Sequence, residues 1–142
     1  MFNNIPELNK EVSADEPLYM YLIINTDLNM SVGKIGGQIG HAVQYFMEYY
    51  NSIGLFNINA RCRVKKWNDN SDIAKITLAA DTKQFNKIKK EYNPIVVIDK
   101  GHTEIQAGSE TVICLYPMYK DERSKTLKRL QILKNSDVLD GS

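Results

Sequence analysis

Apolar and polar residues alternate along the chain in blocks that predict strands and helices in turn. Apolar runs of strand length occupy residues 19–24, 73–80, 95–98 and 111–115. Apolar residues at three- and four-residue spacing predict helices over residues 30–50, 82–92 and 121–133. Residues 51–72 show no clear period and fit a short helix or an ordered loop around Trp67. Strands alternating with helices predict an α/β fold, in which helices cover the faces of a sheet.

The predicted helix over residues 30–50 has two different sides. Its apolar stripe should face the sheet and consists of Ile35, Ile39, Ala42, Val43, Phe46 and Tyr50. Another side carries Lys34, Gln38 and His41 at the same spacing, so three polar side chains would stand in a row near the start of the helix. That row is consistent with a functional site, and equally with the solvent-exposed polar side of a helix that has only a structural role.

Glycines make this helix unusual. Gly36, Gly37 and Gly40 lie inside it, and each lowers helix stability by roughly 0.5 to 1 kcal/mol relative to alanine. Packing must therefore hold the helix, and we expect the glycine side, which includes Gly33, to allow close approach of another backbone. The P-loop and the GxGxxG dinucleotide pattern are both absent, so Lys34 beside a helix start is only a general anion-binding signal.

Composition fits a soluble single domain. The chain has 142 residues, of which 43% are hydrophobic and 25% charged. No apolar run approaches the 18 or so residues of a membrane span, and the start lacks the regions of a signal peptide, so we expect a cytoplasmic protein without membrane contact. Cys62 and Cys114 form no metal-binding spacing, and a disulfide is not expected in that compartment.

Charge divides the chain into three parts. Residues 1–17 form a polar, acidic arm, residues 135–142 form an acidic tail, and residues 18–134, the predicted domain, hold 17 basic against 11 acidic residues, a net charge of +6. The bases cluster as Arg61, Arg63, Lys65 and Lys66; Lys83, Lys87, Lys89 and Lys90; and Lys125, Lys128, Arg129 and Lys134. These clusters are either solvated helix faces or an electrostatic footprint for nucleic acid.

A second candidate site follows the buried strand over residues 95–98. Ligands of α/β sheets usually bind beyond the carboxyl ends of strands, and residues 99–109 there contain a carboxylate, a lysine, an imidazole, hydroxyls and glycines. A plain connection between two strands would also need glycines and polar residues. Composition alone leaves both interpretations open.

The two candidate segments together resemble one known family. Residues 26–42, TDLNMSVGKIGGQIGHA, are similar to the first motif of the peptidyl-tRNA hydrolase 2 family, and residues 98–112, IDKGHTEIQAGSETV, to its second motif. The resemblance extends over residues 19–133 and is weakest over residues 51–72.

This resemblance implies a mixed four-stranded sheet with helices on both faces, often as a homodimer, which hydrolyses the ester between peptide and tRNA in peptidyl-tRNA without a metal or other cofactor. Carried over by position, the site residues are Lys34, Gln38, His41, Asp99, Thr103, Gly108, Ser109 and Thr111, and His102 stands where the family usually has arginine. We expect Asp99 to orient or deprotonate a water molecule with help from Thr103, and Lys34 to stabilise negative charge. We expect Gln38, His41, His102, Gly108, Ser109 and Thr111 to contact substrate.

Other interpretations remain. A triad of Ser109, a histidine and Asp99 can be written, and so can a metal site from both histidines with Asp99 and Glu104, but neither has a specific spacing. Departures from the family pattern at His102, Glu104 and Ala107 favour a homologue that binds tRNA or protein without turnover, since a lost arginine and an added carboxylate weaken attraction for phosphate. The acidic arm could instead dock a partner.

Overall fold

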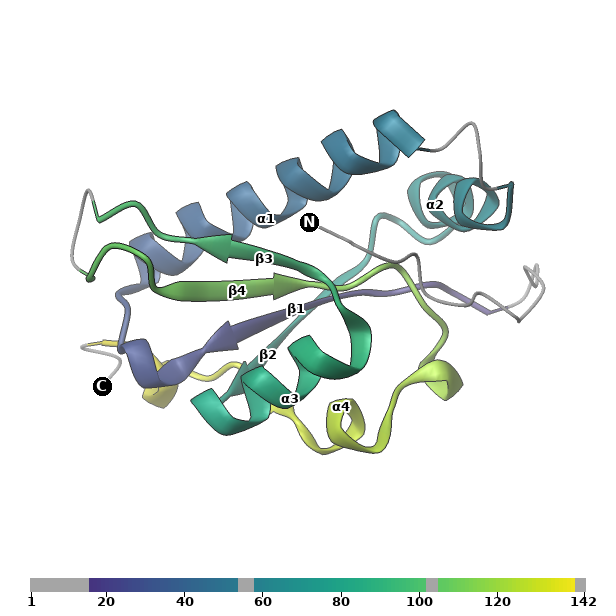
Figure 1. The fold of residues 1–142 in the computed structure, drawn as a ribbon. Helices are drawn as coiled ribbons and strands as arrows, with labels where there is room; N and C mark the ends of the chain where they lie inside the picture. Colours follow the sequence, from purple (N-terminus) through teal and green to yellow (C-terminus); the bar gives the residue numbers. More distant parts are fainter. Residues whose placement is uncertain (1–15, 54–57, 102–104, 140–142) are drawn as a thin grey trace.

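A single mixed sheet organises the part of the chain that the structure, a computed structural model, describes, namely residues 16–53, 58–101 and 105–139. The strand order is β3-β4-β1-β2-β5, with β1 and β2 parallel and every other pair of neighbours antiparallel. The strands are β1 (Met20–Asn25), β2 (Lys75–Ala80), β3 (Ile95–Ile98), β4 (Glu110–Cys114) and β5 (Gln131–Ile132). The helices α1 (Val32–Ile53) and α2 (Ile58–Asn70) cover one face, and α3 (Thr82–Tyr92) and α4 (Lys125–Arg129) cover the other (Figure 1).

The fifth strand corrects the expected count of four and the length of the last helix. The predicted helix over residues 121–133 is a short turn, η3 (Lys120–Glu122), then α4, and then β5. Leu130 already has an extended backbone, with φ −70° and ψ 142°, and the Leu133 N–H donates to the Thr77 carbonyl. The spacing of the leucines is compatible both with one continuous helix and with a short helix followed by a strand. Pairing with the free edge of β2 supplies backbone hydrogen bonds that the sequence pattern does not reveal.

The long helix α1 confirms the predicted apolar stripe and corrects the expectation for the glycines. Ile35, Ala42 and Phe46 are buried against the sheet. In contrast, a Cβ atom built at any of the four helix glycines would meet no atom within 4 Å in the described part of the chain. The glycines therefore lie on the solvent side, and the packing that holds α1 comes from its opposite side.

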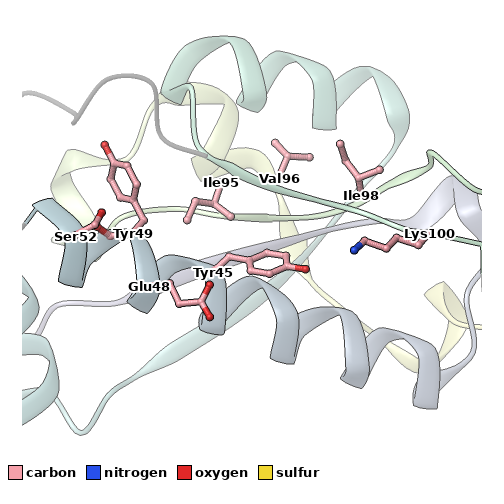
Figure 2. A pocket seen from close by; sticks show the side chains of 8 residues that line it. All are labelled: Tyr45, Glu48, Tyr49, Ser52, Ile95, Val96, Ile98 and Lys100. Atoms are coloured by element: carbon pink, nitrogen blue, oxygen red, sulfur yellow. The ribbon is translucent and has the colours of Figure 1, made fainter.

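A groove separates the second half of α1 from β3, which lies at the edge of the sheet (Figure 2). Its volume is about 560 Å³. It is lined by Tyr45, Glu48, Tyr49 and Ser52 from α1 and by Ile95, Val96, Ile98 and Lys100 from β3 and the residues after it. Its walls are mostly apolar, although the groove is open to solvent.

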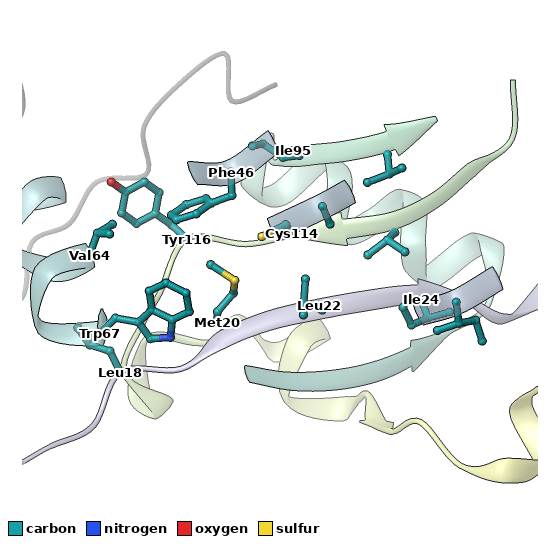
Figure 3. Packing of buried hydrophobic residues seen from close by; sticks show 14 of the residues in the cluster. Leu18, Met20, Leu22, Ile24, Phe46, Val64, Trp67, Ile95, Cys114 and Tyr116 are labelled. Carbon is teal, nitrogen blue, oxygen red and sulfur yellow. The ribbon is translucent and has the colours of Figure 1, made fainter. Parts of the chain in front are cut away.

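Two hydrophobic clusters lie on opposite faces of the sheet and fix the helices. On the α1 side, Phe46 packs edge to face on Trp67 and on Tyr116, with ring centroids 6.4 and 5.1 Å apart (Figure 3). The Trp67 Nε1–H donates to the Ala74 carbonyl at 2.8 Å, which anchors α2. The uncertain region around Trp67 is thus a helix. On the other face, Phe85 and Ile88 of α3 are fully buried.

Part of the first basic cluster is structural. Arg63 is 1% exposed, and its Nη1 and Nη2 donate to Oε1 and Oε2 of Glu122 at 2.7 and 2.5 Å. Lys66 is also buried and donates to the Glu16 carbonyl and to the Tyr119 hydroxyl. These two cations therefore tie α2 to distant segments and cannot belong to a nucleic-acid surface.

Replacing Glu122 by alanine is expected to destabilise the fold by about 3 to 5 kcal/mol, because it leaves the buried Arg63 guanidinium without its carboxylate. Urea unfolding followed by circular dichroism measures this. Lys89→Ala is the control: its pair with Glu110 is about one-third exposed, so its loss should cost only about 0.2 to 1 kcal/mol. Equal effects of the two substitutions would contradict the structural role of Arg63.

No helix within the described ranges is long and apolar enough to span a lipid bilayer. Cys62 is exposed, Cys114 is buried, and neither belongs to a disulfide.

Candidate functional site

The candidate site lies at the end of the sheet where the C-terminal ends of β1 and β3 meet the start of α1 (Figure 1). After β1, a short turn, η1 (Thr26–Leu28), leads into α1. Asn29, with φ 52° in the left-handed region, ends that turn. Ser31 then caps α1: its hydroxyl accepts the Lys34 backbone N–H at 3.2 Å, and its carbonyl accepts the Ile35 N–H at 3.0 Å. The cap fixes Lys34 in the first turn of the helix.

The central feature is an ion pair between the two sequence motifs. Lys34 Nζ lies 2.5 Å from Asp99 Oδ1, and the two side chains are only 8% and 4% exposed. Sixty-five residues separate them in the chain. A charge-assisted hydrogen bond with so little solvent around it is stronger than an exposed one, and it fixes the position of both groups.

The segment around Asp99 is anchored on all sides. Its second carboxylate oxygen accepts the Gly101 N–H at 2.8 Å, its own N–H donates to the Ser109 carbonyl at 2.8 Å, and its carbonyl accepts the Gly108 N–H at 2.7 Å. A carboxylate oxygen can accept more than one hydrogen bond, so this geometry is compatible with a water molecule as a further donor.

Two glycines permit this geometry. Gly101 has φ +78° and Gly108 has φ +89°, conformations that L side chains rarely adopt. A Cβ on Gly101 would also lie 2.7 Å from the Ala107 Cβ. The Gly101 amide was not predicted from the sequence as a site group. The pattern Asp-Lys-Gly could have indicated it, since an aspartate side chain often accepts the backbone N–H two residues ahead.

Gln38 and Thr111 form a second link between α1 and the sheet. Both are buried, and the Thr111 hydroxyl donates to Gln38 Oε1 at 2.7 Å. The structure thus brings Lys34, Gln38, Asp99 and Thr111 together between one helix turn and the ends of two strands. This bond between the Thr111 hydroxyl and the Gln38 amide oxygen positions α1 against β4.

Asn25, at the end of β1, was not predicted and organises the neighbouring surface. It is buried, and its Oδ1 accepts the Asp27 N–H at 3.2 Å and the Thr82 hydroxyl at 3.4 Å. Its Nδ2 donates to the Glu110 carbonyl at 3.4 Å. The Thr82 N–H donates to Asp27 and lowers the pKa of that carboxyl. These bonds hold the start of α3 beside the site. The only feature of the sequence that could have indicated this role of Asn25 is that a polar residue ends a buried strand.

The remaining predicted residues divide into three groups. Ser109 flanks Asp99, but its hydroxyl donates to the Gln106 carbonyl at 2.7 Å. His41 is exposed and stacks on Tyr45, with ring centroids 6.0 Å apart. Among the described residues no hydrogen bond joins Ser109 to His41, which leaves the triad written with His41 without support. His102, Thr103 and Glu104 lie outside the described residues.

Two other chemistries find little support in this part of the chain. No group of three or more His, Cys, Asp or Glu side chains within the described ranges is placed to hold a metal ion. Burial raises the pKa of the Cys114 thiol, so that sulfur stays protonated and is a poor nucleophile.

Comparison with known proteins adds an independent finding. The sequence model of the family described as "Peptidyl-tRNA hydrolase PTH2" matches residues 18–133. The chain belongs to the peptidyl-tRNA hydrolase 2 family. Both halves of the Lys34–Asp99 pair lie inside the matched region, which confirms the resemblance of the two motifs.

Similar proteins of this family come from distant organisms. The chain is 31% identical over 134 residues to the "Probable peptidyl-tRNA hydrolase 2" of Dictyostelium discoideum, which covers 86% of this chain and 59% of that relative. For the protein of the same name in Drosophila melanogaster the identity is 27% over 123 residues, with 80% and 61% covered. For the "Peptidyl-tRNA hydrolase" of Methanothermobacter thermautotrophicus it is 27% over 117 residues, with 79% and 96% covered. The chain thus spans less than two thirds of the first two relatives and almost all of the third.

Proposed function

We propose that this member of the peptidyl-tRNA hydrolase 2 family hydrolyses the ester that joins a peptide to the 3′ end of tRNA. The observation that carries the proposal is the buried Lys34–Asp99 pair, which unites the family's two motifs at the end of the sheet. Ester hydrolysis needs a positioned water, a group that takes its proton and a positive charge for the developing oxyanion. An anchored carboxylate beside an ammonium group meets the last two needs directly.

In the proposed reaction, the Asp99 carboxylate orients a water molecule and accepts its proton as the water oxygen attacks the ester carbonyl carbon. The Lys34 ammonium, held by Asp99 at the start, stabilises the negative charge that develops on the carbonyl oxygen. The bond to the ribose 3′ oxygen then breaks, and that oxygen takes the proton that Asp99 accepted from water. The new carboxylic acid releases its own proton to solvent. The products are a peptide with a free carboxylate and tRNA with a free 3′ hydroxyl. The Gly101 amide keeps the Asp99 carboxylate in place throughout.

His102 and Thr103 remain proposed site residues on the family pattern alone. A homodimer in the cytoplasm is part of the same proposal and rests on the family resemblance.

The direct test is release of an N-acetylated amino acid from tRNA by the purified protein. Cleavage well above the rate without protein supports the hydrolase. An inert protein that still binds tRNA would overturn it and favour a binding homologue that has lost turnover.

The exposed cations near the start of α3 are proposed to hold the tRNA backbone. Lys83, Lys87 and Arg129 line a small groove of about 250 Å³ between α3 and α4. The hydrogen bond from Thr82 to Asp27 places this end of α3 beside the turn that leads to Lys34. Such contacts with phosphates carry no sequence information, which suits a substrate class that contains many tRNAs.

Binding of deacylated tRNA should therefore weaken steeply as salt increases. Replacing Lys83, Lys87 and Arg129 together by alanine should reduce the slope of log Kd against log salt by about 1 for each phosphate that the protein no longer neutralises. Filter binding between about 50 and 200 mM salt measures it. Lys75→Ala, an exposed lysine at the opposite end of β2, is the control and should leave the slope unchanged. An unchanged slope in the triple variant would place the RNA elsewhere.

A further inference from the structure

The polar row that begins with Lys34 continues far beyond the candidate site. At the same three- and four-residue spacing, one side of α1 presents Lys34, Gln38, His41, Tyr45, Glu48 and Ser52. The stacking of His41 on Tyr45, with ring planes 15° apart, joins the first half of this row to the second. Tyr45, Glu48 and Ser52 line the groove between α1 and β3. One side of one helix thus runs from the ion pair into the groove.

The opposite wall of the groove also begins at the ion pair. Ile98 and Lys100, the two chain neighbours of Asp99, both line it. Figure 2 shows Tyr45 and Lys100 pointing toward one another at one end, with Tyr49 and Ser52 at the other end. The groove therefore ends beside the chain position of Asp99, the residue proposed to act on the ester.

This wall is a strand edge with hydrogen-bonding groups to offer. Among the described residues β3 pairs only with β4. The N–H and C=O of Asp99 are both directed to that side, to Ser109 and Gly108. The pairing register shifts between Val97 and Ile98, and the Val97 carbonyl still accepts the Thr111 hydroxyl on the β4 side at 3.3 Å. Since backbone groups alternate in direction along an antiparallel strand, we infer that those of Val96 and Ile98 are directed away from β4. The Ile98 side chain is 57% exposed and so is accessible to a ligand in the groove.

We propose that the peptide part of peptidyl-tRNA lies in this groove and pairs, as an additional strand, with the edge of β3 that faces away from β4. The inference rests on the proposed function: a peptide would lie in the groove only if the ester of peptidyl-tRNA is bound at Lys34 and Asp99. Backbone pairing with a strand edge recognises any extended peptide, and apolar walls accept varied side chains. That combination suits a substrate whose peptide differs from molecule to molecule.

The length of the edge sets the size of the subsite. The four residues of β3, at about 3.3 Å per residue, can pair with about four residues of peptide. The catalytic efficiency should rise with peptide length up to about that number and then level off. A single N-acetylated amino acid would reach the ion pair but leave most of the groove empty.

The test compares kcat/KM for two substrates made on the same tRNA with the same esterified residue, one N-acetyl-aminoacyl-tRNA and one N-acetyl-pentapeptidyl-tRNA. For the wild type we expect the longer substrate to be favoured by about tenfold or more, the scale of a few apolar contacts. Tyr45→Ala should lower this ratio severalfold. Ile98→Pro should lower it further than Ile98→Ala, because proline removes the outward N–H and leaves pairing with β4 intact. Ile58→Ser, which alters an exposed isoleucine on α2, should leave the ratio unchanged.

The outcomes separate this inference from the function on which it rests. No cleavage of either substrate by the wild type would overturn both. Cleavage of both at equal efficiency, or a ratio that none of the groove variants changes, would overturn the peptide subsite and leave the hydrolase standing. A ratio unaffected by Ile98→Pro, together with a change in particle mass measured by light scattering, would assign the edge to a second copy of the chain.

Discussion

Lys34→Ala lowers the rate constant for cleavage of bound N-acetyl-aminoacyl-tRNA by about 10² to 10³, the loss typical when one group that stabilises an oxyanion is removed. The reason lies in the environment of the ammonium. Its side chain is only 8% exposed, so water cannot replace its charge efficiently when the carbonyl oxygen becomes negative. Single-turnover cleavage at saturating protein measures the chemical step apart from binding.

Two controls accompany this prediction. Removing Lys34 takes the ammonium away from the buried Asp99 carboxylate, so the melting temperature of the variant must be compared with that of wild type. Lys34→Met keeps most of the side-chain volume and therefore tests the charge alone. Lys75→Ala removes an exposed lysine far from the site and should cleave normally. Full activity in a folded Lys34→Met variant would remove the ammonium from the mechanism.

Asp99→Asn is expected to slow cleavage by about 10² to 10⁴, the range that general acid-base catalysis contributes. The substitution preserves size and can still accept the Gly101 N–H, but an amide cannot take a proton from water at neutral pH. Because the asparagine is also uncharged, the hold on Lys34 weakens, and both effects act in the same direction.

Glu110→Gln is the matched control for Asp99→Asn. It makes the same chemical change at a nearby carboxylate, which pairs with Lys89 and is about one-third exposed. We expect cleavage by this variant to stay within about twofold of wild type, since surface pairs contribute little. Equal losses in the two variants would mean that the general charge of the region, and not a base at Asp99, matters.

Local patterns in the sequence predicted much of the fold. The spacing of apolar residues predicted the buried stripe of α1. Asp81 predicted the start of α3, where its side chain accepts the Gln84 N–H. The buried run before Asp99 predicted β3 and placed a carboxylate at the end of a strand. The two motifs together then predicted that Lys34 and Asp99 belong to one site, and the structure brings these two side chains to 2.5 Å from each other.

Contacts between distant segments escaped the same patterns. The pairing of β5 with β2 depends on a free strand edge, and a leucine spacing that also fits a helix concealed it. Arg63 looked like one base of a surface cluster because its carboxylate partner, Glu122, lies 59 residues away. The glycines of α1 were expected to pack, yet they face solvent, since a small residue permits a close approach without requiring one. The division into an arm, a domain and a tail stays a prediction.

The most direct test of the account is single-turnover release of N-acetylated amino acid from tRNA by wild type, Lys34→Ala, Asp99→Asn and the double variant, measured side by side. If the two residues act as one unit, wild type cleaves, both single variants lose orders of magnitude, and the double variant is no slower than the worse single variant within about threefold. Losses that multiply in the double variant would contradict joint action. A wild type that binds tRNA but releases nothing would contradict the account as a whole.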